Sequence, residues 1–157
     1  MKSRLIAPLA LGLALTFGAT GCSMVAPQAT TISYSPSDGV NVPDSGPLIV
    51  RNALVIADES GEAGNLLAAV INDTDDGVTL NIGVAGDFQT LRVPARTTVS
   101  LGVDVDPLLI ENLDSKPGSD VEISFQSGDG EGVATAIPVL DGTLPQYEEF
   151  VPRAGDS

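Results

Sequence analysis

The chain lacks histidine and tryptophan, and among its 157 residues it has one cysteine and two methionines. Without histidine it has neither the commonest general base nor the commonest metal ligand, and no side chain that ordinarily titrates near neutral pH. A single cysteine excludes an internal disulfide. These absences disfavour catalysis, redox chemistry and binding of soft metals. We therefore expect a protein that is not an enzyme and holds no cofactor.

Basic residues are also scarce, with seven Lys and Arg against 21 Asp and Glu. Two of the seven, Lys2 and Arg4, lie at the extreme N-terminus; without them the chain carries five basic residues and a net charge of −16. Such a surface repels phosphate backbones and anionic lipid headgroups. We therefore expect no nucleic-acid partner, and any attachment to a membrane must come from a lipid rather than from a basic patch.

The N-terminus carries an export signal. Lys2 and Arg4 precede the apolar stretch Leu5–Phe17, which has the length of a signal-peptide core and is shorter than the ~20 apolar residues of a spanning helix. The small residues Ala19, Thr20 and Gly21 then lead into Cys22. This tetrapeptide resembles a bacterial lipobox, and the alternative is a plain signal peptide that happens to precede a cysteine.

The lipobox resemblance implies that residues 1–21 are removed and that Cys22 is acylated. Two or three acyl chains bind a bilayer firmly, at about 0.8 kcal/mol for each buried methylene. We expect a lipid-anchored protein, palmitoylated or otherwise acylated, on the extracytoplasmic face of the cell membrane. The bilayer is then a partner through Cys22.

The remainder divides by composition into three parts. Residues 22–46 are rich in Ser, Thr, Pro and Gly without a sustained hydrophobic period, which predicts a flexible tether. Residues 47–140 alternate between short apolar segments and Gly/Asp turns. Residues 141–157 form an acidic tail with prolines, in which Tyr147–Val151 is either solvated or a short docking segment.

The middle part predicts an all-β fold. Period-two alternation indicates strands at 48–57, 66–71, 78–84, 88–93, 98–105, 108–111, 121–125 and 133–140. No helical period is convincing, and no block repeats. About seven or eight strands with this spacing favour an antiparallel β-sandwich of immunoglobulin or cupredoxin type. We expect its core to include Leu54, Ile56, Val70, Leu80, Ile82, Val99, Leu101, Ile123, Phe125, Val133 and Ile137.

Three stretches are similar to the periplasmic copper chaperone (PCuAC-type) family of small cupredoxin-like sandwiches. They are Gly64–Asp76, Val93–Leu101, where the family has a "IPAGGTVTL"-like strand, and Leu109–Phe125. The family binds Cu(I) through His and Met, soft donors that suit this ion. Counted from Leu101, its His-x-Met pair falls near Pro107 and Leu109, and its ligand-bearing insertion shrinks to Gly83–Phe88. The resemblance therefore implies a degenerate member without a metal site.

Other polar motifs have bland interpretations that we favour. Asp73–Gly77 fails the spacing of an EF-hand, so it predicts a polar turn, with a loose calcium site as the alternative. Gly128–Gly132 predicts a hairpin turn rather than a phosphate loop, and Asp104 with Asp106 predicts a solvated pair. Arg92 and Arg96 flank Pro94 and are expected either to pair with local carboxylates or to form a partner-facing patch.

Three functions remain open from the sequence. The first is a non-catalytic envelope lipoprotein that binds another protein or assists assembly. The second is a copper chaperone for respiratory oxidase assembly, as the family resemblance suggests. The third is an enzyme, which the missing histidine and free thiol disfavour.

Overall fold

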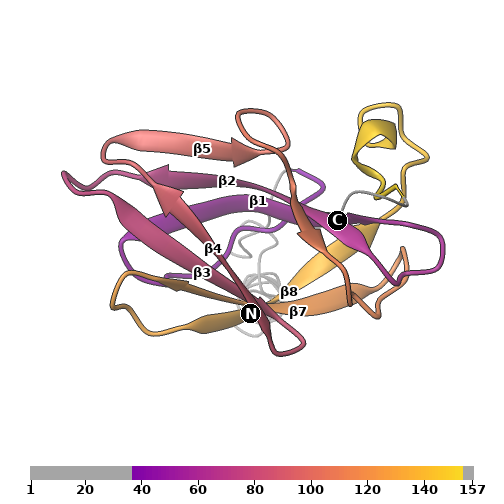
Figure 1. The fold of residues 1–157 in the computed structure, drawn as a ribbon, viewed down its shortest axis with the longest axis horizontal. Helices are drawn as coiled ribbons and strands as arrows, with labels where there is room; N and C mark the ends of the chain where they lie inside the picture. The colour runs from indigo at the N-terminus through magenta and orange to yellow at the C-terminus, as the bar shows by residue number, and fades with distance from the viewer. Residues whose placement is uncertain (1–36, 154–157) are drawn as a thin grey trace, which may run out of the picture. The chain divides into compact units, whose positions relative to one another are not determined.

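The structure is a computed structural model that describes residues 37–153 (Figure 1). These residues form eight strands and one short 3-10 helix, η2 (Glu148–Phe150). The strands are β1 (Leu48–Ala57), β2 (Gly64–Asn72), β3 (Val78–Val84), β4 (Asp87–Val93), β5 (Thr97–Leu101), β6 (Leu108–Ile110), β7 (Asp120–Ser127) and β8 (Val133–Leu140). The predicted lipobox Ala19–Cys22 and the signal segment lie outside the described residues.

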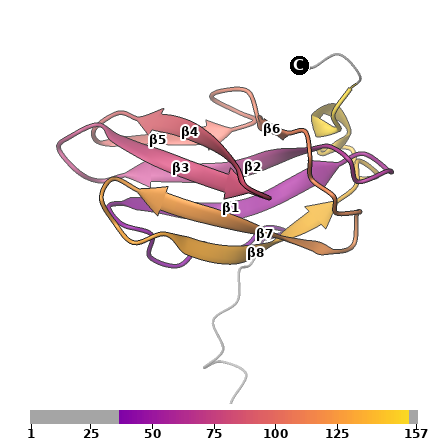
Figure 2. The same cartoon turned by 60° about the horizontal axis from the view of Figure 1, so that its bottom comes forward.

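The strands form two sheets that share β8. The first sheet contains β1, β2, β5 and β6, and the second contains β3, β4 and β7. Along the path the strand order is β4-β3-β7-β8-β1-β2-β5, and β6 adds a second short partner to β2. β7 and β8 are neighbours in the middle of this order, and Figure 2 shows them side by side, away from β4 and β5 at its two ends. The predicted all-β sandwich is confirmed, in a form that is nearly closed on itself.

One strand pair departs from the antiparallel prediction. The first residues of β8, up to Pro138, pair antiparallel with β7, whereas Val139 and Leu140 lie parallel to Val55 and Ile56 of β1. Pro138 has no N–H to donate to a ladder, and it is the last residue paired with β7. The sheet is therefore mixed, because β8 leaves one sheet and joins the other at this proline.

The core lies between the sheets and follows from strand alternation. On β7, Val121, Ile123 and Phe125 are buried while Glu122 and Gln126 face outward. The predicted core residues are all buried except Val133, which is half-buried and packs against the same cluster. Side chains at positions i and i+2 share one face of a strand, so the period-two pattern identified the inward face correctly on strands such as β7. On β1 it did not, because Leu54 and Ile56 are buried in a separate outward cluster, whereas Val55 belongs to the central core.

The folded part begins before the predicted boundary at residue 47. Val40 and Ala53 exchange backbone hydrogen bonds of 2.9 and 2.8 Å, and the Val42 N–H donates to Val50 O at 3.2 Å. Val42 and Ser45 are buried, and the Ser45 carbonyl accepts from Ser127 N–H at 2.9 Å. The last part of the predicted tether therefore covers the edge of the first half of β1, which β8 leaves free.

The folded part also extends beyond residue 140. Tyr147, Phe150 and Val151 pack, with Leu140, against an apolar cluster on the outward side of the first sheet, formed by Leu54, Ile56 and Leu67. The Phe150 carbonyl accepts a hydrogen bond of 2.9 Å from Asn65 Nδ2. We call residues 144–151 the strap. Of the two interpretations of Tyr147–Val151, the structure supports docking, here onto the chain's own sheet.

The strand predicted over 98–105 ends at Leu101. Gly102 has a φ of +87°, a conformation that favours glycine, and it turns the chain away from the sheet. Val103 is then 83% exposed, and Asp104 Oδ2 accepts a hydrogen bond of 2.9 Å from Ser100 N–H. The alternation of Val103 and Val105 was therefore misleading, and Asp104 with Asp106 does not continue a strand face.

Candidate functional site

A hollow with an apolar floor lies where β6 meets the β3–β4 hairpin. This cavity has a volume of about 550 Å³. Its floor includes the buried side chains of Ile82, Val84 and Ile110, and its rim carries amide and carboxylate groups. The lining residues are Ile82, Val84, Asp87, Gln89, Leu108, Leu109, Ile110, Glu111 and Asn112. A volume of this size is within the usual range of ligand sites.

Two polar contacts bridge the rim of the cavity between β4 and the β6 segment. Gln89 Nε2 donates a hydrogen bond of 2.6 Å to the Leu109 carbonyl, and Asn112 Nδ2 lies 3.5 Å from Asp87 Oδ2. All four rim groups, including Glu111, are on exposed residues. The cavity is therefore an apolar depression with a hydrogen-bonding and acidic edge, open to solvent.

The donor set around this cavity does not suit Cu(I). Pro107 and Leu109, where the family resemblance puts the His-x-Met pair, offer no soft donor. The ligand-bearing insertion is replaced by the two-residue turn Ala85–Gly86, with φ values of 51° and 97°. In residues 37–153 no group of three or more His, Cys, Asp or Glu side chains converges as a metal site would require.

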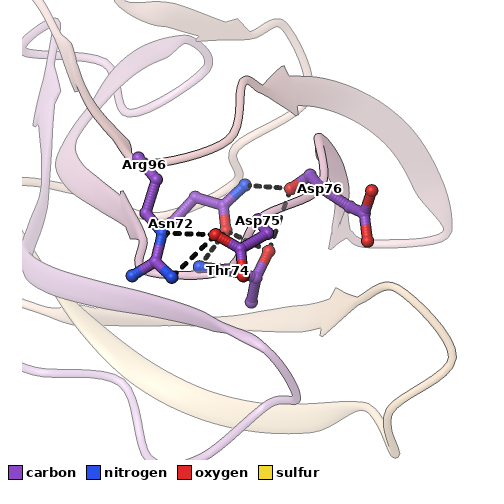
Figure 3. Close-up of polar contacts among 5 residues, drawn as sticks. All are labelled: Asn72, Thr74, Asp75, Asp76 and Arg96. Carbon is purple, nitrogen blue, oxygen red and sulfur yellow. Dashed lines mark hydrogen bonds and ion pairs between the residues drawn. The ribbon is translucent and has the colours of Figure 1, made fainter.

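Arg96 has a local carboxylate partner. Its Nε and Nη2 atoms lie 2.9 and 2.7 Å from Asp75 Oδ1, and the side chains are 64% and 85% exposed (Figure 3). Of the two predictions for Arg96, this geometry favours local pairing. An ion pair this exposed contributes at most about 1 kcal/mol.

The turn that carries Asp75 is organised by Asn72, whose side chain is fully buried. Its Nδ2 donates to the carbonyls of Asp76, Val93 and Pro94 at 2.8, 3.1 and 3.0 Å (Figure 3 shows the first of these). Its Oδ1 accepts from Thr74 N–H and Oγ1 at 3.0 and 2.7 Å. Asn72 thus holds the β2–β3 turn against the β4–β5 turn, which gives the segment 73–77 a structural role.

Arg92 differs from Arg96. It is exposed on the outward side of β4, and its guanidinium lies over Gly77, where an added Cβ would come within 2.8 Å of Nη2. Within residues 37–153, no carboxylate lies at ion-pair distance from Arg92. The prediction that it faces a partner remains open.

The strap contains the segment Tyr147–Val151, for which the sequence left two interpretations open, a solvated tail or a docking segment. Tyr147 Oη donates a hydrogen bond of 2.6 Å to Asp38 Oδ2. Burial, with this carboxylate beside it, raises the pKa of Tyr147 to about 12. The only sequence signal for packing was the set of large apolar side chains at 147, 150 and 151.

No helix in residues 37–153 has the length and hydropathy to cross a bilayer.

Comparison with known proteins supports the fold and leaves the family open. No protein-family model and no curated protein sequence matches the chain. Solved PCuAC domains match its structure. The copper-bound PCuAC domain from PmoF2 has a TM-score of 0.51 and 13% identity over 64% of this chain and 97% of that one. The apo PCuAC domain from PmoF1 has a TM-score of 0.52 and 14% identity over 63% and 97%.

A third structure, the apo PmoF2 PCuAC domain, gives a TM-score of 0.50 at 13% identity, over 64% of this chain and 95% of that one. At this level of identity the likeness concerns the fold alone. The described domain has a PCuAC-like fold, as the resemblance of its strands indicated. The comparisons do not bear on the predicted acylation of Cys22.

Proposed function

We propose that the chain is a membrane-anchored lipoprotein of the cell envelope whose β domain is a non-catalytic module for protein binding or assembly. The observation that carries this proposal is the cavity beside β6. Leu109, where the family resemblance puts one of its two paired copper ligands, lines this cavity, and together with the apolar floor it supports the surface chemistry of a contact site. Aliphatic pockets rimmed by polar groups are typical anchor positions in protein interfaces.

The anchoring part of the proposal rests on Cys22. Acylation there would hold the domain on the extracytoplasmic side of the membrane, and the bilayer would be a partner through the lipid alone. Replacing Cys22 with Ser should move the protein from the membrane fraction to the soluble fraction. A serine variant that remains membrane-bound and uncleaved would show that the N-terminal segment itself is the anchor.

The cavity part is tested by crosslinking in native membranes. The wild-type chain, Leu109→Lys and Leu144→Lys are compared after crosslinking, and captured proteins are identified by mass spectrometry. Leu109 is half-buried in the cavity, and Leu144 is 47% exposed in the strap, outside the cavity. A partner captured by wild type and by Leu144→Lys should be lost with Leu109→Lys. Equal capture by all three would contradict a contact through the cavity.

A copper chaperone for respiratory oxidase assembly is the second candidate, and the fold likeness to a copper-bound PCuAC domain favours it. The donor inventory opposes it, because the only soft donors after residue 21 are Cys22 and Met24. Titration of the chain from residue 23 onward against a competing Cu(I) chelator should show no stoichiometric capture. Capture of one equivalent that survives Met24→Ala would place the chaperone function first.

A further inference from the structure

The outward face of the second sheet bears the residues of three strands and the start of a fourth, and no described segment covers it. Strand registers align Phe88 with Gly83 and Ser124 in one row, and Thr90 with Asn81 and Gln126 in the next. We call this surface the β4 face. Its eleven residues are Thr79, Asn81, Gly83, Phe88, Thr90, Arg92, Glu122, Ser124, Gln126, Ala134 and Ala136.

The β4 face has an unusual charge for this molecule. Only Arg92 and Glu122 among its eleven residues are charged, and they cancel, whereas the whole sequence has 21 acidic residues against seven basic ones. A strongly acidic protein repels its own copies at long range. The β4 face is therefore a surface over which two copies can approach closely without like charges meeting.

Phe88 stands out on this face at 73% exposure. Its ring lies over Gly83, where an added Cβ would come within 2.6 Å of the ring, so the glycine lets the aromatic lie low on the sheet. A hollow of about 400 Å³ lies beside it, lined by Asn81, Ser124, Gln126 and others. An exposed aromatic on a sheet face without net charge has the chemistry of an interface anchor.

The two charges are placed for self-recognition. Arg92 lies four residues beyond Phe88 along β4, on one side of the Phe88 row. Glu122 lies two residues from Ser124 on β7, on the other side of that row. A two-fold axis in the plane of the face and beside Phe88 would bring Phe88 against its own copy. The same rotation would bring each Arg92 toward Glu122 of the other copy, as isologous interfaces require.

We propose that the β4 face is a homodimer interface, with Phe88 at its centre and reciprocal Arg92–Glu122 pairs at its sides. Eleven residues are fewer than the ~20–30 a side of a standard interface. Because standard interfaces reach micromolar affinity at their weak end, this smaller one should be weaker still, with a dissociation constant of about 10–100 µM. Its formation does not depend on the envelope partner proposed above.

Sedimentation equilibrium of the chain purified from membranes, in a density-matched detergent, tests this proposal. Wild type should form dimers, and Phe88→Ala should weaken them by about 30-fold or more, as loss of a central aromatic anchor does. Arg92→Glu and Glu122→Arg each place like charges together and should weaken the dimer by about tenfold. The control Val103→Ala, on the loop after β5, should leave it unchanged.

The double variant Arg92→Glu with Glu122→Arg restores opposite charges and should return the dissociation constant to within about threefold of wild type. Because both side chains are exposed, these variants should keep the fold, which circular dichroism checks. A wild-type chain that remains monomeric at 500 µM, about five times the weakest expected constant, overturns the proposal, even if the same face captures another protein. If wild type forms dimers but the double variant dimerises no better than the single variants, the proposed Arg92–Glu122 pairing is overturned.

Discussion

The outward faces of the two sheets differ in polarity and in whether another segment covers them. On the first sheet, Leu54, Ile56 and Leu67 point away from the central core, and the strap covers them with Tyr147, Phe150 and Val151. On the second sheet the outward residues are small or polar, and only Phe88 is large and apolar. The comparison teaches that a strand with apolar side chains on both faces needs a second segment of the chain to bury its outward face. A strand that alternates can remain bare.

The largest expected difference is in stability. Ile56 is fully buried beneath the strap, and Ile56→Ala should reduce the free energy of unfolding by about 3 kcal/mol through lost burial and a cavity. Asn81→Ala on the β4 face should change it by less than about 0.5 kcal/mol. Urea denaturation followed by circular dichroism measures both values. Equal losses of unfolding free energy would show that the two faces contribute equally to stability.

The strap itself should contribute less than the residues it covers. Phe150→Ala removes a half-buried ring but leaves the backbone carbonyl that accepts from Asn65. We expect a loss of about 1–2 kcal/mol in the same denaturation experiment. Leu144→Ala, 47% exposed, serves as the control. If Phe150→Ala matches its control, the strap lies on the sheet without stabilising it.

Phe88→Ala tests the same comparison on the uncovered β4 face. At protein concentrations well below the dimer range, this variant should lose less than about 1 kcal/mol, because most of the ring is already in water. Thermal denaturation at low micromolar concentration measures the change. A loss as large as that of Ile56→Ala would mean that the ring belongs to a core rather than to a surface.

The smallest effect should appear at high pH. Because the pKa of Tyr147 is raised to about 12 from its usual value near 10, the folded state keeps its proton where the unfolded state loses it. The Tyr147 contribution to stability is therefore complete below pH 10 and is lost as the pH rises through 12. Tyr147→Phe should show a shallower decline in unfolding free energy over this interval. Identical slopes would contradict the contact with Asp38.

The sequence allowed most of the strands to be predicted, because short-range alternation decides which side of a strand is buried. It also anticipated the strand that is apolar on both sides, Leu66–Ile71, which lies in β2 between β1 and β5. It overextended β5 because Val103 and Val105 keep the period after Gly102 has turned the chain. A positive φ at one glycine outweighed a pattern of two valines.

Pairing between strands far apart in the chain could not be predicted from the sequence. Nothing local to Val139 and Leu140 indicates a parallel partner 84 positions earlier at Val55 and Ile56, and the strap was recognisable only as a few large apolar residues. At the candidate site, the absence of soft donors at Pro107 and Leu109 followed from the sequence. The cavity beside them did not, because its walls come from β3, β4 and β6 together.

The strap and β8 impose an order on folding. β1, the first strand described, gains its parallel partner from β8, the last one, and its outward side is covered by Leu140 of β8 and by the strap. Contacts so distant in sequence form slowly, because a long loop must close first. A chain emerging from its N-terminus could not complete either sheet until β8, at Val133–Leu140, was free. For a protein with the predicted export signal, this delay would keep the domain unfolded for as long as it is still being threaded.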